Sequence, residues 1–85
     1  MTISAAEIDP RVQSVSVSDQ RLEVALRDGR VISAPLSWFP RLATAEAKAR
    51  QVWEPSAAGL GIHWPLIDED LSVEGLLRGG GSIGQ

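Results

Sequence analysis

Residues 61–77 read GIHWPLIDEDLSVEGLL, and this stretch decides how the second half of the chain folds. We predict a strand over Leu60–Trp64, where apolar residues precede Pro65, a residue that interrupts strand pairing. Further on, Ser72 fits as the N-cap of a last helix, because its hydroxyl can accept a hydrogen bond from a free backbone N–H. Two leucines flank this cap and would form its hydrophobic staple: Leu71 and Leu76.

Immediately before this stretch, Glu54–Gly61 interrupts the helical pattern that precedes it. A strand near Trp53–Ala57 and a glycine-containing turn would complete a short hairpin with the strand at Leu60–Trp64. Pro55 confines the first of these strands to a sheet edge, because proline cannot donate a ladder hydrogen bond.

The first third of the chain alternates apolar and polar residues, which predicts half-buried antiparallel strands. The strands begin near Val12, and Pro35 ends the third of them. At Asp28-Gly29, a three-residue loop with Gly29 in the left-handed region would place Val24 opposite Ile32. This register gathers the larger apolar set on one face, whose members are Leu22, Val24, Ile32, Ala34 and Leu36.

Apolar residues at helical spacing then predict a short helix over 37–43 and a longer one over 44–52, separate or joined. Ser37 fits as the first N-cap, with Pro40 tolerated in the first turn. Thr44 fits as the second cap, with Glu46 near the positive end of that helix.

These elements predict an α+β fold: an antiparallel β-meander followed by helices, a second short hairpin and a C-terminal helix. A chain of 85 residues is the size of one domain. We expect that domain to span residues 1–85, with an ordered core over about 12–78 and a flexible, glycine-rich tail over 79–85.

Composition excludes several functions. The chain has no cysteine, so disulfides and thiolate metal sites are ruled out. Its net charge of −3 is uneven: residues 1–53 hold seven Arg or Lys and six Asp or Glu, whereas residues 54–85 hold one Arg and five Asp or Glu. Nucleic-acid-binding modules usually present a basic face, so we do not expect direct binding to DNA or RNA by the domain alone. The sequence has no signal peptide and no apolar run near the ~20 residues of a membrane span, so we expect a cytoplasmic protein.

The chain resembles the bacterial family of domains of unknown function (DUF) 2442 over roughly residues 12–78. The resemblance lies in the alternating strands before Asp28-Gly29-Arg30, in Pro35-Leu36, in Trp38-Phe39-Pro40-Arg41-Leu42 with Ala43-Thr44, and above all in residues 61–77. It implies a small α+β domain in which a meander precedes helices and a further hairpin. Some members are joined to a DNA-binding helix-turn-helix domain, and others are encoded beside toxin-like proteins, which implies an antitoxin or regulatory role.

Two positions depart from the family pattern. Members often carry proline after the threonine, where this chain has Ala45, and glycine-rich residues where it has Pro55-Ser56-Ala57-Ala58. No helix-turn-helix segment follows residue 78 in this sequence, so a DNA-binding function is not carried over from the fused relatives.

The only histidine, His63, lies near three carboxylates, but the sequence shows no catalytic constellation around it. A serine–histidine–acid triad needs a positioned nucleophile, and there is no Gly-x-Ser-x-Gly elbow. The acidic run Asp68-Glu69-Asp70 does not have the spacing of an EF-hand loop. We therefore expect no enzyme activity, no metal site and no cofactor, and we interpret these carboxylates as a solvated turn ahead of a helix or as a recognition surface.

Three tryptophans are many for a chain with one phenylalanine and no tyrosine. We expect them mainly in the core, but Trp38 and Phe39 are neighbours that cannot both point inward from one helix. The expected partner-binding residues are therefore Trp38, Phe39 and Pro40 in one patch and Asp68, Glu69 and Asp70 in another.

The sequence thus predicts a non-enzymatic binding module, antitoxin-like or regulatory, that acts through a protein partner such as a small basic toxin. A homodimer that hides the same patch is left open. The alternative is an accessory DNA-binding transcriptional regulator that uses the basic N-terminal half of a dimer.

Overall fold

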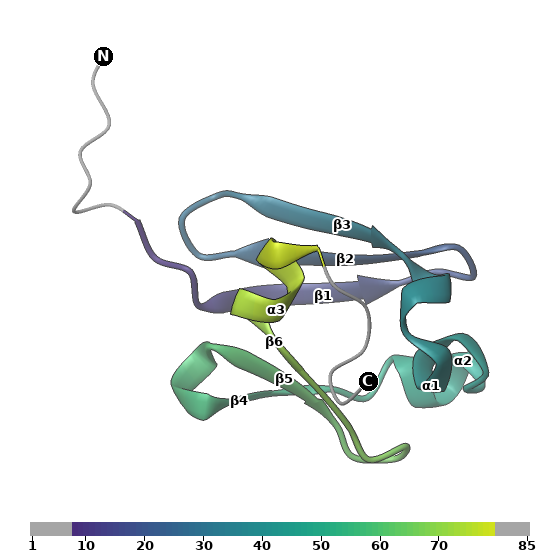
Figure 1. The fold of residues 1–85 in the computed structure, drawn as a ribbon. Helices are drawn as coiled ribbons and strands as arrows, with labels where there is room; N and C mark the ends of the chain where they lie inside the picture. The colour runs from purple at the N-terminus through teal and green to yellow at the C-terminus, as the bar shows by residue number, and fades with distance from the viewer. Residues whose placement is uncertain (1–7, 80–85) are drawn as a thin grey trace.

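The computed structural model describes residues 8–79, which form two three-stranded antiparallel sheets and a few short helices (Figure 1). The predicted α+β class and the order of its parts are therefore confirmed. The flexible tail expected over 79–85 falls, apart from Gly79, outside the described residues.

The first sheet is a meander whose strands are paired in chain order. Its strands are β1 (Val12–Val17), β2 (Arg21–Leu26) and β3 (Val31–Pro35). Val24 lies opposite Ile32, and Gly29 has φ +96°, so the predicted three-residue loop is confirmed. Within that loop, the Leu26 N–H donates to the Arg30 carbonyl at 2.8 Å. The predicted inward face of β2 is buried.

The second sheet is also paired in chain order, but it contains a strand that the sequence reading missed. Its strands are β4 (Glu54–Ser56), β5 (Gly61–Trp64) and β6 (Glu69–Ser72). The predicted turn for the acidic run is wrong at two of its residues, because Glu69 and Asp70 belong to β6. The turn before β6 holds Asp68 at φ +53°. This left-handed conformation favours Asn and Asp after glycine, and it lets the chain that turns after Pro65 reverse without a glycine.

Between the two sheets the chain forms short helical segments rather than the two helices predicted. They are the 3₁₀ turn η2 (Leu36–Trp38), α1 (Pro40–Ala43) and α2 (Ala47–Arg50). Neither predicted cap forms. Ser37 lies inside η2, and the Thr44 hydroxyl instead donates back to the Pro40 carbonyl at 2.9 Å, at the end of α1. Pro40 opens α1, where its missing N–H costs nothing.

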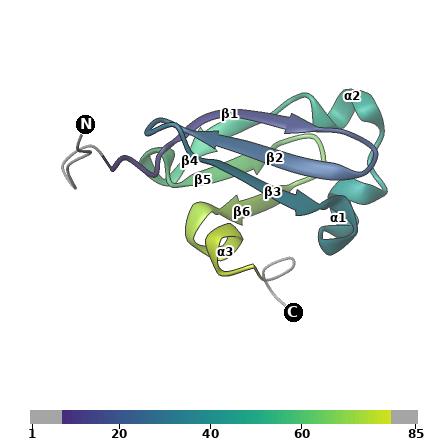
Figure 2. The same ribbon diagram turned by 90° about the horizontal axis from the view of Figure 1, so that it is seen from above.

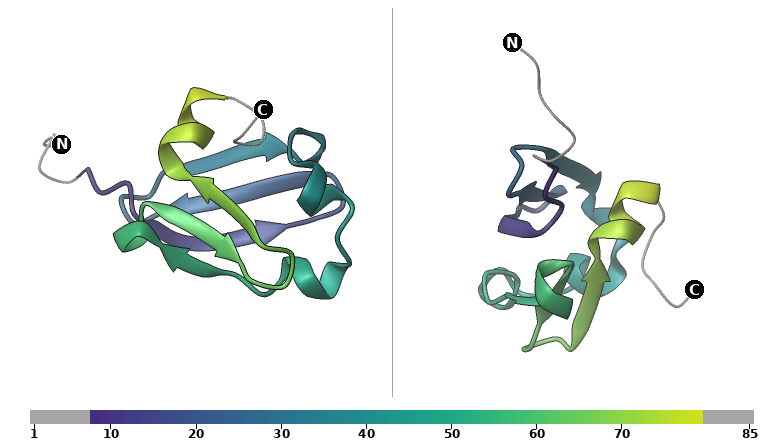
Figure 3. Two further views of the ribbon diagram at one scale, coloured as in Figure 1. Left: turned by 60° about the horizontal axis from the view of Figure 1, so that its bottom comes forward. Right: turned by 90° about the vertical axis from the view of Figure 1, so that its left-hand side faces the viewer.

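The C-terminal helix α3 (Val73–Arg78) is capped as predicted. The Ser72 hydroxyl accepts a hydrogen bond from the Gly75 N–H at 2.9 Å, and Leu71 and Leu76 are both buried. In the views of Figures 2 and 3, α1 and α2 lie at one end of the two layers, and α3 lies against their side.

One hydrophobic core fills the space between the layers. Its largest fully buried side chains are Trp64, Phe39, Leu22, Leu42, Ile62 and Val24. Buried and more exposed residues alternate along β2 and β6, which is the period-two pattern of sheets that bury one face.

Arg50 joins the parts of the fold. Its buried guanidinium donates to the carbonyls of Leu42 and Ala43 and forms an ion pair with Asp19 in the turn between β1 and β2. Its own carbonyl accepts a hydrogen bond from the indole N–H of Trp64 at 3.1 Å. One residue therefore connects the first sheet, α1, α2 and the second sheet.

Candidate functional site

The predicted Trp38-Phe39-Pro40 patch is only partly present. Trp38 is 40% exposed and Pro40 is exposed, but Phe39 is completely buried, so its assignment to a partner-binding surface is wrong. The rings of Trp38 and Phe39 meet edge to face with centroids 6.5 Å apart. The backbone turns between η2 and α1, and this turn sends the two neighbouring rings in different directions, one into the core and one toward solvent.

The acidic run is likewise divided. Asp68 and Asp70 are exposed, whereas Glu69 is 7% exposed and points inward with Leu71. Successive side chains of a strand point to opposite faces, so three consecutive carboxylates cannot form one surface. One Glu69 oxygen accepts the Asp70 N–H at 3.2 Å, and the other has no hydrogen-bond partner among the described residues. Glu69 is therefore not available to a partner as predicted.

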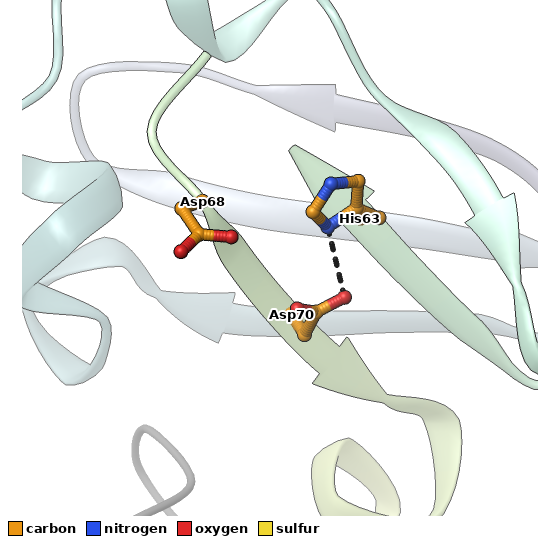
Figure 4. Close-up of side chains that lie close together, drawn as sticks. All are labelled: His63, Asp68 and Asp70. Atoms are coloured by element: carbon orange, nitrogen blue, oxygen red, sulfur yellow. Dashed lines mark hydrogen bonds and ion pairs between the residues drawn. The ribbon is translucent and has the colours of Figure 1, made fainter. Parts of the chain in front are cut away.

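His63 lies on the outer face of the second sheet, in register with Glu54 on one side and Asp70 on the other. Its Nδ1 is 2.9 Å from an Asp70 carboxylate oxygen, and Asp68 completes a cluster whose polar atoms lie within 4.8 Å of one another (Figure 4). An imidazole and two carboxylates are a donor set that divalent metals accept. The hydrogen bond between His63 and Asp70 already accounts for their pairing.

This cluster lacks the other parts of a hydrolytic site. Within residues 8–79, no serine hydroxyl is hydrogen-bonded to the His63 ring. Its two aspartates are open to solvent, and Asp70 is 65% exposed at its side chain. A histidine oriented by a carboxylate can accept a proton, but among residues 8–79 the only hydrogen-bond partner of the His63 ring is Asp70.

The sequence reading missed a surface beside α3. Two adjoining depressions of ≈ 300 and ≈ 380 Å³ share Ala57, Leu60 and Ser72 in their walls. The first continues over Ser56, Gly61, Asp70 and Leu71, and the second over Pro10, Val73, Glu74 and Leu77. We call the two together the α3 groove.

The walls of the groove come from segments far apart in the sequence. One wall is the 3₁₀ turn η3 (Ala57–Gly59) with Leu60, and the other is the start of α3. The Val73 N–H donates to the Leu60 carbonyl at 3.0 Å and fixes the two walls against each other. Leu60 and Leu77 remain 46% and 52% exposed. The groove is therefore an open surface whose walls are already held in place.

The backbone of η3 is strained. Ala57 and Ala58 have φ of +51° and +58°, and Gly59 follows at +91°. Non-glycine residues avoid the left-handed region because their Cβ approaches the following carbonyl oxygen, at ~1–2 kcal/mol per residue. The signal for this turn in the chain itself is Gly59, which follows the two alanines in the left-handed region.

One sequence signal could have indicated part of this surface. Leu76 and Leu77 are adjacent on one helix, so both cannot face the core, and Leu76 is the buried one. The facing wall at Leu60 carried no such signal, because its position depends on the turn at η3.

The comparisons with known proteins place the chain in a family. The family described as "Protein of unknown function (DUF2442)" matches residues 12–82, so the chain belongs to it, as the residues had indicated. A crystal structure of a protein of unknown function from Rhodospirillum rubrum ATCC 11170 is similar, with 28% sequence identity and a TM-score of 0.72. The likeness covers 87% of this chain and 92% of that one. No curated protein matches the chain.

The part of the chain that the structure describes contains no helix long and apolar enough to cross a membrane.

Proposed function

We propose that this domain is a non-enzymatic binding module of the bacterial cytoplasm, an antitoxin-like or regulatory protein that acts through a protein partner. The observation that carries the proposal is the α3 groove, with its exposed Leu60 and Leu77 and its buried floor at Val73. Apolar side chains gathered around an open depression are typical of surfaces that another molecule covers.

Trp38 offers a second contact to a partner. Tryptophan is enriched among the residues that dominate binding energy, and Trp38 is 40% exposed beside the exposed Pro40. The single exposed ring makes a smaller surface than the aromatic pair predicted from the sequence. We therefore assign the main contact to the α3 groove and a supporting one to Trp38.

The alternative, an accessory DNA-binding regulator, draws less support. Residues 8–53 hold seven Arg or Lys and five Asp or Glu. However, Arg11, Arg30 and Arg50 are each paired with an aspartate at 2.9 Å. Charges already neutralised within the protein contribute little to phosphate binding. A gel shift with non-specific DNA at low salt tests this alternative directly, and a stable complex would favour it.

Capture from the extract of a native host tests the proposal. The bait is compared with two variants, Leu77→Glu in the groove and Leu66→Glu in the turn between β5 and β6. Leu66 is a matched control, because it is exposed at 61% and lies outside the groove. We expect one protein to be retained by the wild type and by Leu66→Glu and to be lost from Leu77→Glu. Retention of the same proteins by all three baits would contradict the groove as the binding site.

A further inference from the structure

We propose that the α3 groove takes a short segment of the partner in which apolar side chains stand beside arginine or lysine. This inference rests on the proposed function and adds the chemistry of the partner. It comes from two observations on the described residues, namely the apolar walls of the groove and the carboxylates at its ends.

The walls determine the apolar part of the ligand. The larger depression is lined by Pro10, Ala57, Leu60, Val73 and Leu77, with Ser72 and Glu74 as its only polar lining residues among those described. Depressions of ≈ 300 and ≈ 380 Å³ lie at the lower end of the ~300–1,000 Å³ range of ligand sites. Each therefore seats one or a few side chains of a peptide rather than a large cofactor.

The groove is already formed without a ligand. The hydrogen bond from Val73 to Leu60 fixes its walls, and the Ser72 cap fixes the start of α3. The Cγ of Arg11 would lie only 3.0 Å from a Cβ added at Gly59, so η3 also packs closely on the chain entering β1. A preformed groove reduces the ordering cost of binding and suits a short segment.

The carboxylates at the edge of the groove determine the charged part of the ligand. Asp70 lines the smaller depression and Glu74 the larger one, and their side chains are 65% and 77% exposed. Residues 54–79 hold five carboxylates and one arginine, so the field around the groove is negative. Such a surface attracts a cationic segment and disfavours an acidic one.

Neighbouring cations do not cancel this field. Arg11 donates to both carboxylate oxygens of Asp9, at 2.9 Å each, and its charge is neutralised there. Arg78 contacts Glu74 at 2.9 Å, but both side chains are more than 70% exposed, as in helix pairs worth only ~0.3–0.5 kcal/mol. A lysine or arginine from the partner can therefore replace Arg78 at Glu74.

Selection from a library of random short peptides displayed on phage tests the proposal. The library is selected on the wild-type protein and then depleted on Leu77→Glu, so that only groove-dependent peptides remain. We expect the recovered peptides to combine Leu, Ile, Phe or Trp with Lys or Arg. Acidic or uncharged peptides, or peptides that bind Leu77→Glu equally well, would overturn the proposal.

Affinity measurements on one recovered peptide test the role of charge. The double variant Asp70→Asn/Glu74→Gln should bind it at least ~10-fold more weakly than the wild type, with a shallower dependence on salt. The control is Glu23→Gln/Glu46→Gln, which removes the same charge from exposed residues outside the groove. Equal weakening by both double variants would overturn the assignment of Asp70 and Glu74 as the contacts.

Light scattering tests self-association as an alternative explanation. We expect the wild-type protein and Leu77→Glu to have the same mass in solution. A wild-type dimer that Leu77→Glu converts to a monomer would overturn the proposal in favour of a second copy as the occupant.

The binding function and the chemistry of the partner can be contradicted by different results. Loss of a native partner from Leu77→Glu, together with selection of acidic peptides, would overturn the partner chemistry and leave the binding function in place. A second result would have the opposite meaning: peptides with basic and apolar residues require Leu77 for binding, but no native protein does. The groove would then bind such peptides, and the proposed function would be contradicted.

Discussion

The two sheets of this protein have the same topology but differ in how they are encoded. Both are antiparallel and paired in chain order. In β2 the inward positions are all apolar, namely Leu22, Val24 and Leu26, and the outward positions are solvated. In β6 one inward position is the buried Glu69. A period-two pattern identifies a strand only when the buried positions are apolar. The single inward carboxylate of Glu69 therefore prevented β6 from being recognised in the sequence.

The largest effect is expected at the residue that connects the two sheets. Arg50→Met keeps the aliphatic stem but removes the guanidinium that donates to the carbonyls of Leu42 and Ala43. The Leu42 carbonyl keeps the Ala45 N–H at 3.2 Å as a donor. Buried hydrogen bonds that involve a charged group contribute ~1.5–3 kcal/mol, and we expect a loss of stability in that range. Urea unfolding followed by tryptophan fluorescence measures it.

Arg21→Met is the matched control for this change. Arg21 is exposed and donates to the Ser33 hydroxyl within the first sheet alone. We expect it to cost less than ~1 kcal/mol. Equal losses for the two variants would show that the connection through Arg50 is not what holds the sheets together.

The next largest loss of stability is expected at the one predicted helix cap that forms. Ser72→Ala should cost ~0.5–2 kcal/mol, because the Gly75 N–H loses its acceptor at the start of α3. Ser37→Ala, at a predicted cap that does not form, should change stability by less than ~0.5 kcal/mol. A larger loss at Ser37 than at Ser72 in thermal or urea unfolding would reverse this assignment.

The turns of the two sheets should respond to substitution with opposite signs. Gly29→Ala places a Cβ at φ +96°, where it touches nothing within 4 Å, so the expected loss of ~1 kcal/mol comes from the backbone alone. Ala58→Gly removes a Cβ from a residue at φ +58° and should gain up to ~1 kcal/mol. A loss of stability in Ala58→Gly would mean that η3 is not left-handed in solution.

The smallest effect is expected at the aspartates of the first half. Hydrogen bonds from Arg11 lower the pKa of Asp9 to about 2, and hydrogen bonds from Arg30 lower the pKa of Asp28 below its usual value. A carboxyl whose pKa is depressed by folding stabilises the protein above its unfolded pKa. It loses that contribution as the pH falls, here between pH ~4 and pH ~2.

Urea midpoints measured across this window test the acid effect. Asp28→Asn should show a smaller decrease on acidification than the wild type, because its ion pair with Arg30 is already absent. The same decrease in the wild type and in Asp28→Asn would show that this pair does not contribute.

Much of the fold could be predicted from local patterns. The loop at Gly29, the register of Val24 with Ile32 and the cap at Ser72 all depend on residues within a few positions of each other, and all were confirmed. The predicted helices rested on helical spacing and on caps at Ser37 and Thr44 that do not form. The predicted helices were too long. Between the sheets, the Arg50 guanidinium donates to the Leu42 carbonyl and the Thr44 hydroxyl donates to the Pro40 carbonyl, in place of a continuous series of helical hydrogen bonds.

The candidate site was less accessible from sequence. The prediction that Trp38 and Phe39 do not both point inward is confirmed. The assignment of Phe39 to the exposed patch is wrong, since Phe39 is in the core. The α3 groove requires the Leu60 carbonyl to meet the Val73 N–H, and these residues are brought together only by tertiary pairing of β5 with β6.

The pairing of both sheets in chain order has a consequence for how the protein folds. Sheets built from consecutive strands have short loops to close, and low contact order of this kind favours rapid folding. On the ribosome the first sheet can form before residues 61–76 emerge. Its apolar face then stays uncovered until Ile62, Trp64 and Leu71 arrive. Nascent chains stalled within that interval should bind chaperones, and those that extend past α3 should not.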